Sequence, residues 1–321
     1  MVTPTPRLGW EADRYEWLHA RRQGLGASDV AALLGFSTYT TPWQVWAEKT
    51  NAARPPDEMS EAAALGTALE PWLVGQAAVL LDRPVMRTEH QLYAHAEHPW
   101  RLCSPDAEAG PDTLVEAKTA GLLSRRPAKG WDDDAVPLGY EFQARWAMHV
   151  MDRMKVEMVA LVAGHGVLHR SLVRDLSIEA DLVAQVSEWW QHHVVEGNEP
   201  PVGELDNAML SLVYPKPDGT EVDLDDTDAD RLWLAYLAAR DQERTSKAVK
   251  EGAGAALKRL LGDHEHGLLA GRVAVAWGTR KGPIDYKRLV ADLIATTDID
   301  VPDPELYRGP SSRSLSVKEP K

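Results

Sequence analysis

The sequence is poor in the residues that build disulfides, iron–sulfur clusters and zinc sites. It has a single cysteine, Cys103, among 321 residues, which excludes an intrachain disulfide and a four-cysteine cluster. The histidines, including the neighbours His192 and His193, lack accompanying cysteines at a zinc-ligand spacing. Cys103 stands near Trp100 and Leu102, so we expect a small buried hydrophobic residue in a reducing compartment.

Long hydrophobic runs are also missing. No run of 18 apolar residues appears, and residues 1–10 lack the basic start and apolar centre of a signal peptide. We therefore expect a soluble protein of the cytoplasm, which is the bacterial host cytoplasm if the gene belongs to a phage or prophage.

Basic residues are the minority among the charges. The chain has 35 Lys and Arg against 49 Asp and Glu, a net charge of -14. Duplex-binding surfaces are usually basic. A DNA-binding function therefore requires cations gathered in a channel while the outside stays acidic.

Two carboxylates and one amine have a spacing typical of a metal-dependent nuclease site. Residues 114–118 alternate as a strand does, so Glu116 and Lys118 share a face. If residues 102–106 form the antiparallel neighbour, with a turn at residues 110–112, Asp106 lies beside Glu116. Such a pair binds Mg²⁺ or Mn²⁺, and Lys118 stabilises charge on a phosphate. On its own, the triplet is equally compatible with an exposed ion pair on a strand.

Two helical segments carry further polar candidates. Glu70 precedes Pro71, which is tolerated in a first turn, so we expect that helix to begin near Leu69. Glu70 either faces the helix dipole or is a third metal carboxylate. Gln143 interrupts an apolar helical face that starts at Tyr140, and it either bonds to backbone or orients a water or metal ligand.

An arginine-rich segment precedes a glycine-containing turn near the N-terminus. Ser28 is a predicted N-cap of the helix that follows, and an arginine lies one turn before the glycines, in the segment Arg21–Gly26. The segment is either a simple capped helix or an anion pocket for a terminal phosphate.

These blocks resemble, in order and spacing, the lambda-exonuclease-like (YqaJ-type) viral recombinase family, whose core belongs to the PD-(D/E)xK nuclease superfamily. The resemblance covers roughly residues 14–195. The matching blocks are residues 17–28 with 33–37 and 42–49, residues 66–70, residues 104–106 with 115–118, and the helix carrying Tyr140 and Gln143.

The resemblance implies a fold and a set of site residues. The fold is an α/β core with a central mixed β-sheet flanked by helices. Asp106, Glu116 and the backbone carbonyl of Ala117 are the implied ligands of a first metal ion, and Glu70 contributes to a second. Lys118 is the implied catalytic lysine, with Gln143 in support. Arg21 and Ser28 match the positions that hold the 5′ phosphate, with Arg22 as an alternative to Arg21.

The implied activity is that of a 5′-to-3′ exonuclease. It requires two Mg²⁺ ions, with Mn²⁺ as a substitute, and digests linear double-stranded DNA to leave 3′ single strands for a single-strand annealing protein. By analogy the protein is a homotrimeric ring.

Arg125 and Arg126 join Arg22 as candidate DNA contacts. Two alternatives stay open, namely a structure-specific or restriction-type endonuclease and an inactive DNA-binding assembly protein.

The sequence predicts two parts, a nuclease core over residues 1–200 and an extension over residues 201–321. Residues 231–261 are helical, and Gly252 and Gly254 within them favour an α-helical hairpin. A strand through residues 273–277 and a strand at residues 314–317 predict a small β unit, with a helix from Tyr286 between them. We expect this extension to serve assembly first, and the Arg280–Lys281 turn to contact DNA second.

Overall fold

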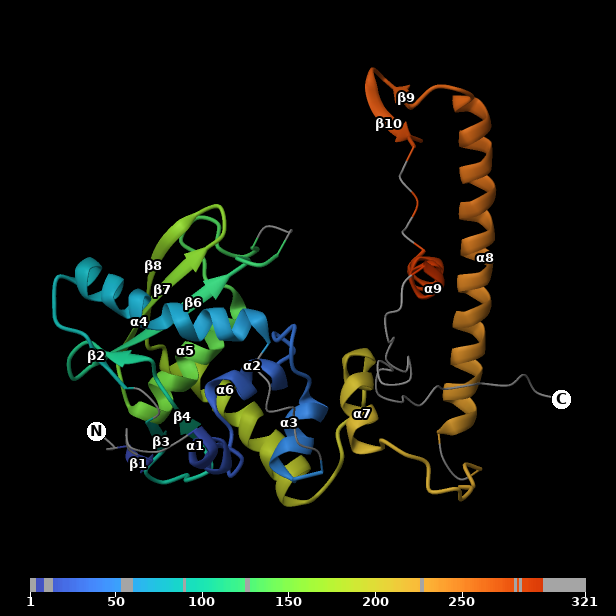
Figure 1. The fold of residues 1–321 in the computed structure, drawn as a ribbon. Helices are drawn as coiled ribbons and strands as arrows, with labels where there is room; N and C mark the ends of the chain where they lie inside the picture. Colours follow the sequence, from blue (N-terminus) through green and yellow to red (C-terminus); the bar gives the residue numbers. More distant parts are fainter. Residues whose placement is uncertain are drawn as a thin grey trace. The chain divides into compact units, whose positions relative to one another are not determined.

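The computed structural model describes residues 4–8, 14–52, 60–88, 91–124, 128–225, 228–279, 282 and 285–296. The chain divides into two compact units, Met1–Tyr214 and Pro215–Lys321 (Figure 1). This division differs from the predicted boundary at residue 200. Helix α7 (Asn207–Val213) belongs to the first unit because its Met209 packs against Trp43 and Ala47 of α3 (Pro42–Lys49).

The first unit is built around a mixed five-stranded sheet in the order β2-β5-β6-β7-β8. Its long central strands β6 and β7 are parallel, and every other neighbouring pair is antiparallel. The strands are β2 (Met86–Arg87), β5 (Ala107–Glu108), β6 (Thr113–Ala120), β7 (Lys155–Val162) and β8 (Gly166–Val173). The predicted central mixed sheet is confirmed.

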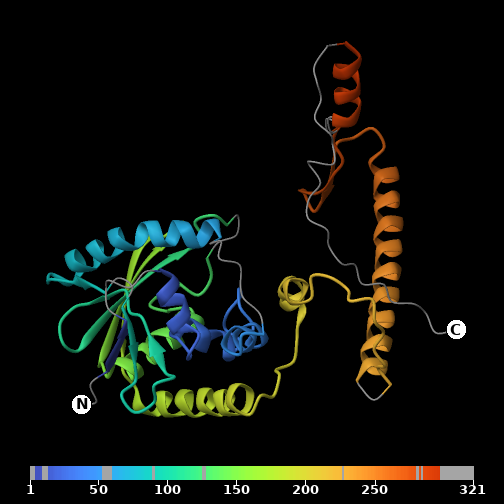
Figure 2. The same cartoon turned by 60° about the horizontal axis from the view of Figure 1, so that its bottom comes forward.

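Helices cover both faces of this sheet, as predicted. Helix α4 (Glu61–Leu81) lies on one face, where its Leu73 and Val74 pack with Val115 and Val159. On the other face lies α5 (Leu138–Met151), and α6 (Leu176–Trp189) packs against α5 (Figure 2). Short helices complete the unit, namely α1 (Arg14–Arg21), α2 (Ala27–Leu33) and the turns Trp190–Val195 and Glu204–Asp206.

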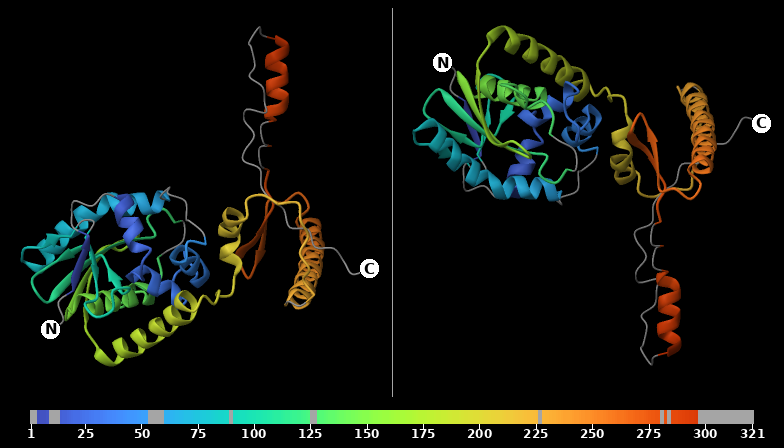
Figure 3. Two further views of the ribbon diagram at one scale, coloured as in Figure 1. Left: turned by 90° about the horizontal axis from the view of Figure 1, so that it is seen from below. Right: turned by 90° about the horizontal axis from the view of Figure 1, so that it is seen from above.

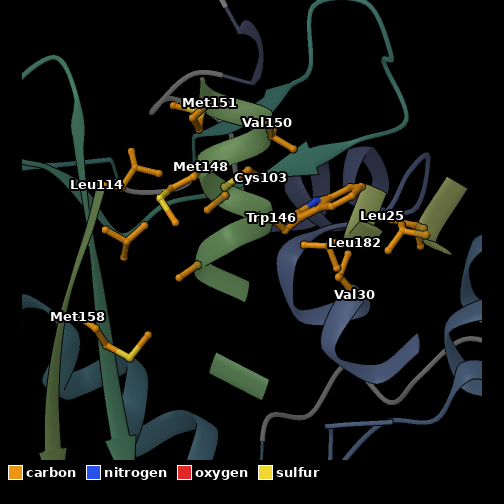
Figure 4. Packing of buried hydrophobic residues seen from close by; sticks show 14 of the residues in the cluster. Leu25, Val30, Cys103, Leu114, Trp146, Met148, Val150, Met151, Met158 and Leu182 are labelled. Carbon is orange, nitrogen blue, oxygen red and sulfur yellow. The ribbon is translucent and has the colours of Figure 1, made fainter. Parts of the chain in front are cut away.

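The main core lies on the α5 side of the sheet. Trp146 of α5 is its largest fully buried side chain, and it lies between Leu25, Val30 and Leu182 from three other segments (Figure 4). The Trp146 indole Nε1–H donates to the Leu102 carbonyl at 3.0 Å, so this buried polar group is satisfied. Cys103 belongs to the same core, as expected.

A second, three-stranded sheet corrects the predicted strand at residues 102–106. Only Leu102–Cys103 (β4) is a strand, and it pairs with β3 (Leu92–Ala94), which in turn pairs with β1 (Thr5–Leu8). The neighbour of β6 is instead β5, after the break at Ser104 and Pro105. Pro105 has no N–H to donate to a ladder, which explains the change of sheet at this point. The turn at residues 110–112 is present, with Gly110 at a φ of 94°.

Helix α4 begins eight residues earlier than the predicted start near Leu69. It starts at Glu61, and the Ser60 hydroxyl accepts from the Ala63 N–H at 3.2 Å as its N-cap. Pro71 lies inside the helix. Proline removes one backbone hydrogen bond, a loss that the packing of the inner face offsets here.

By length and composition, α4 is the one helix among the described residues that is apolar enough to cross a membrane. Its Leu73 and Ala77 are at most 1% exposed and belong to the core over the sheet, whereas only 17% of the apolar window is buried. The helix therefore packs on the sheet by one face.

The second unit contains one long helix rather than the predicted hairpin. Helix α8 (Ala229–Leu261) runs without interruption through Gly252 and Gly254. Figure 1 shows this helix from the side, and Figure 3 shows it nearly along its axis. Each glycine costs a helix only about 1 kcal/mol, and the surrounding alanines favour its continuation. The predicted strand through residues 273–277 is confirmed as β10 (Arg272–Ala276), but it pairs with β9 (His266–Leu269), a strand that was not predicted. Helix α9 (Tyr286–Thr296) is the predicted helix. The Arg280–Lys281 turn and the strand at residues 314–317 lie outside the described residues.

Candidate active site

Strand β6 presents Glu116 and Lys118 on one face, as the alternation predicts. The Lys118 Nζ lies 2.5 Å from the Glu116 Oε1. The Lys118 side chain is 19% exposed and that of Glu116 13%. The ion pair of the alternative reading is therefore present, but both of its side chains are largely withdrawn from water rather than exposed.

Asp106 lies next to this pair, immediately before β5. The register pairs Ala107 with Val115, which brings residue 106 level with Glu116. The Asp106 Oδ2 accepts a hydrogen bond from the Ala117 N–H at 2.7 Å. This bond fixes the carboxylate against the backbone of β6, so Asp106, Glu116, Ala117 and Lys118 form one group.

The electrostatics of the group are dominated by excess negative charge. Burial raises the pKa of Asp106 well above its usual range, and the Glu116 and Glu70 carboxylates raise it further, while Lys118 and the Ala117 N–H oppose them. Burial lowers the pKa of Lys118, but Glu116 and Asp106 outweigh that effect and raise it. Lys118 is therefore an ammonium at neutral pH, and it faces more carboxylates than it can neutralise.

Glu70 approaches the group from α4. It forms a longer ion pair with Arg87, whose Nη2 lies 3.7 Å from the Glu70 Oε1. Within the described ranges, no three His, Cys, Asp or Glu side chains are already gathered as a metal cluster. The donor set nevertheless fits a hard divalent cation, because Asp106, Glu116 and the Ala117 carbonyl offer oxygen atoms, and Lys118 balances only one of the two carboxylates.

Tyr140 of α5 completes the surroundings of Lys118. The Lys118 Nζ lies 5.5 Å from the centre of the Tyr140 ring, a cation–π contact. Burial raises the pKa of Tyr140, with Lys118 opposing. Gln143 follows one turn later on α5 and is half-buried. Its proposed role in orienting a water or ligand stays a prediction.

The predicted phosphate residues Arg21 and Ser28 are brought together. The Arg21 Nη2 donates to the Ser28 Oγ at 2.6 Å and lies 2.9 Å from the Asp29 Oδ1, while its guanidinium stacks 5.4 Å from the Trp17 ring. Ser28 is not the N-cap that was predicted. Gly26 caps α2, and the Asp29 carboxylate accepts from the Gly26 N–H at 2.9 Å.

Asp29 and Lys49 are the polar residues that the sequence analysis missed. The Lys49 Nζ lies 2.8 Å from the Asp29 Oδ2, and the Lys49 side chain is fully buried. Burial raises the pKa of Asp29, but Arg21 and then Lys49 outweigh it and lower the pKa. A charged residue directly before a buried apolar run is a usable signal for Asp29, whereas nothing in the sequence links it to Lys49.

The loop between Arg21 and α2 is fixed to the segment that leads to Asp106. The Leu25 N–H donates to the Trp100 carbonyl at 2.7 Å, and the Leu102 N–H donates to the Leu25 carbonyl at 2.9 Å. A Cβ atom on Gly24 would lie 2.1 Å from the Trp100 carbonyl oxygen, so only glycine fits there. We call Arg21, Ser28 and Asp29 the Arg21 cluster. These backbone hydrogen bonds hold the loop after Arg21 against the segment that leads to Asp106.

The remaining candidate DNA contacts are less defined. Arg22 is half-buried beside Arg21. Arg125 and Arg126 lie outside the described residues.

With this geometry in place, the chain can be compared with known proteins. Residues 16–154 match the family model of the YqaJ-like viral recombinase domain. The matched residues include Glu70, Asp106, Glu116, Lys118 and the Arg21 cluster.

A similarity to a single protein extends over most of the chain. The uncharacterized protein YqaJ of Bacillus subtilis is 25% identical over 287 residues, which cover 87% of this chain and 88% of that protein. Among solved structures, an alkaline exonuclease from Laribacter hongkongensis is 19% identical with a TM-score of 0.45, covering 57% of this chain and 93% of that one. A phage-related exonuclease from Haemophilus somnus is 10% identical with a TM-score of 0.36, covering 55% and 96%.

Proposed function

We propose that this protein is a metal-dependent 5′-to-3′ exonuclease that acts on the ends of linear double-stranded DNA. The observation that carries the proposal is the convergence of Asp106, Glu116 and Lys118 on the Ala117 backbone, within a YqaJ-like viral recombinase domain. Two largely buried carboxylates that share one ammonium favour a divalent cation, and the ammonium favours a phosphate.

The chain's own residues have distinct tasks in phosphodiester hydrolysis. Asp106, Glu116 and the Ala117 carbonyl would hold Mg²⁺, with Mn²⁺ as a substitute, and Glu70 would serve a second ion. When bound, the cation supplies Lewis-acid stabilisation of the charge that develops on the attacked phosphate.

Lys118 acts as a cation and not as a base. Its ammonium is held between Glu116 and the Tyr140 ring, a position from which it donates hydrogen bonds to the attacking water or to a phosphate oxygen. A fixed donor of this kind stabilises the transition state without reorganisation.

The Arg21 cluster is the proposed 5′-phosphate site. Arg21 and the Ser28 hydroxyl are adjacent, and together they offer donors that a phosphate monoester accepts. Arg22, Arg125 and Arg126 stay candidate contacts to the duplex. Gln143 is a candidate for orienting the attacked water.

The biological setting is recombination of the phage type. The 3′ single strands left by digestion are the substrate of a single-strand annealing protein, which we propose as the partner. We further propose a homotrimeric ring around the duplex and a location in the bacterial cytoplasm.

The test compares the purified chain with Asp106→Ala in Mg²⁺ on end-labelled linear duplexes, with or without a 5′ phosphate, and on a covalently closed circle. Asp112→Ala is a matched control, because Asp112 is an exposed aspartate in the turn between β5 and β6. We expect mononucleotides from linear DNA only, lost in Asp106→Ala and kept in Asp112→Ala.

Other outcomes would replace the proposal. Cutting of the circle would favour an endonuclease, and full activity of Asp106→Ala would remove that residue from the site. Inactivity of the wild-type chain on every substrate would favour a DNA-binding assembly protein. A separate comparison of Arg21→Ala with Arg22→Ala tests which arginine recognises the DNA end. The variant that loses the phosphate site should lose the preference for a 5′-phosphorylated end, and the other should keep it.

A further inference from the structure

Two exposed aromatic side chains lie on the loop between α2 and α3. Phe36 is 43% exposed and Tyr39 is 86% exposed, and we call this pair the aromatic shelf. Single exposed aromatic residues are ordinary on a protein surface. These two differ because they belong to a restrained loop beside the candidate active site.

Hydrogen bonds restrain the backbone of the loop. The Phe36 N–H donates to the Ala31 carbonyl of α2 at 2.9 Å. The Ser37 Oγ accepts from the Tyr39 N–H at 3.2 Å and from the Thr40 N–H at 3.1 Å, a turn that serine side chains commonly form. The backbone of Tyr39 is therefore held in place, while its ring extends into solvent.

The shelf rests on the first turns of α5. The Phe36 ring stacks on the Phe142 ring with their centroids 5.2 Å apart, and these are the two phenylalanines of the chain. Phe142 in turn packs against the main core. A Cβ atom on Gly139 would lie 2.7 Å from the Phe36 carbonyl oxygen, so the loop backbone is in direct contact with α5.

The same part of α5 carries Tyr140, the aromatic neighbour of Lys118. The Lys118 Nζ lies 5.5 Å from the centre of the Tyr140 ring. Burial raises the pKa of Tyr140 and Lys118 opposes that effect, while the Tyr39 phenol adds to the increase. Tyr140 is thus a common neighbour of the shelf and of the candidate catalytic lysine.

The shelf also follows the helix that begins at the Arg21 cluster. Ser28 and Asp29 lie in the first turn of α2, and the loop follows Leu33, the last residue of that seven-residue helix. A helix of this length spans about 10 Å, and stacked nucleotides of one strand rise about 3.4 Å each. A strand whose 5′ phosphate binds at the Arg21 cluster therefore reaches the shelf within its first three nucleotides.

Charge does not oppose a nucleic acid at this loop. Residues 30–47 contain no charged side chain, although 26% of the residues in the chain are charged. Acidic side chains would repel the phosphates of a strand. This segment instead offers aromatic rings and the hydroxyl groups of Ser37 and Thr38.

We propose that the aromatic shelf is a stacking site for one unpaired nucleobase among the first three nucleotides of a bound strand. The inference rests on the proposed function, because that proposal supplies the DNA strand. Every nucleobase has a π-face, so stacking on Tyr39 holds a base without reading the sequence. Phe36 secures the loop through its own stack on Phe142.

An apolar contact with a protein partner is the less favoured occupant. Aromatic residues are also enriched at protein interfaces, but the neighbouring Lys118 site favours a nucleic acid. The two occupants differ in what they require of residue 39. Stacking on a base requires a ring, whereas an apolar contact is largely kept by leucine.

The test measures binding of 5′-phosphorylated single-stranded oligonucleotides by fluorescence anisotropy in Ca²⁺. In a matched series, one abasic residue replaces the first, second or third nucleotide. Stacking of one base on an aromatic ring corresponds to a roughly 5- to 150-fold change in affinity. We expect wild type to bind the intact strand at least about fivefold more tightly than one of the abasic strands, and Tyr39→Ala to bind both equally.

Three variants control the measurement. Tyr15→Ala is the matched control, because Tyr15 is a tyrosine of α1 that is 72% exposed, and it should keep the preference of wild type. Tyr39→Phe should also keep the preference, and Tyr39→Leu should lose it. All of these variants should melt as wild type does, since both tyrosines are exposed.

The outcomes separate this inference from the proposed function. Equal binding of the intact and abasic strands by wild type, or an unchanged preference in Tyr39→Ala, would overturn the stacking site even if the protein digests linear DNA. A Tyr39→Leu variant that behaves as wild type would overturn it in favour of a general apolar contact. Failure of the cleavage assay would overturn the proposed function alone, because a preference lost in Tyr39→Ala would still identify a nucleobase site.

Discussion

Replacing Asp29 by asparagine isolates the energetic role of the buried charge cluster beside Arg21. The Asp29 carboxylate receives the Lys49 ammonium at 2.8 Å, the Arg21 guanidinium at 2.9 Å and the Gly26 N–H at 2.9 Å. Asparagine keeps the shape and one acceptor oxygen but removes the charge. The fully buried Lys49 then loses its main partner.

The size of the effect follows from what remains around Lys49. Removing one partner of a buried ion pair typically costs about 3–5 kcal/mol. The Glu48 Oε1 still lies 3.8 Å from the Lys49 Nζ, and the Arg21 carbonyl accepts from it at 3.3 Å. We therefore expect Asp29→Asn to lower the free energy of unfolding by about 3 kcal/mol, the lower end of that range. This loss lowers the melting temperature by roughly 6–12 °C in a unit of this size.

Urea unfolding followed by tryptophan fluorescence measures this difference. Asp181→Asn is the matched control, because Asp181 is exposed on α6, and its stability should change by less than about 0.5 kcal/mol. A second variant, Asp29→Asn with Lys49→Met, removes the uncompensated ammonium and should recover part of the loss. Equal stability of Asp29→Asn and wild type would show that the cluster contributes nothing to folding.

Three further predictions concern pH, thiol reactivity and DNA binding. Burial raises the pKa of Glu179, but hydrogen bonds from Arg174 and His149 outweigh it and lower the pKa to about 2. The stability that Glu179→Gln removes should thus be full at neutral pH, shrink as the pH falls below about 4.5, and vanish near 2 in urea titrations. Burial raises the pKa of the Cys103 thiol well above its usual range, so a thiol reagent should label it only in unfolded protein. Duplex binding should be at least tenfold weaker in EDTA than in Ca²⁺ by fluorescence anisotropy, and equal binding would contradict a cation-dependent site.

The grouping of Asp106, Glu116 and Lys118 was predictable because its determinants are local. Period-two alternation places Glu116 and Lys118 on one face in any strand, and a short turn brings Asp106 beside them. The exact partner strand was not predictable, because the break at Pro105 moves residues 102 and 103 into another sheet.

The start of α4 and the Asp29–Lys49 pair were not predicted from the sequence. Both depend on contacts between segments that are distant in the chain. Pro71 ends a helix in isolation, but packing over the sheet carries α4 through it. The Asp29–Lys49 pair joins α2 to α3, and no sequence pattern indicates that these two side chains meet. Tertiary contacts override local propensity in both cases.

The proposed DNA substrate must be consistent with an acidic composition. The relevant observation is that the basic side chains of the site are each paired with a carboxylate. Arg21 is paired with Asp29, and Lys118 is paired with Glu116. Each cation is thereby held in place, but its charge is already balanced within the chain. Under the proposed function, the positive charge that attracts a phosphate would come largely from divalent ions bound to the carboxylates, and burial raises the pKa of Asp106 among them well above its usual range. The acidic residues would then hold the ions that bind DNA, so the proposal is consistent with a net charge of -14.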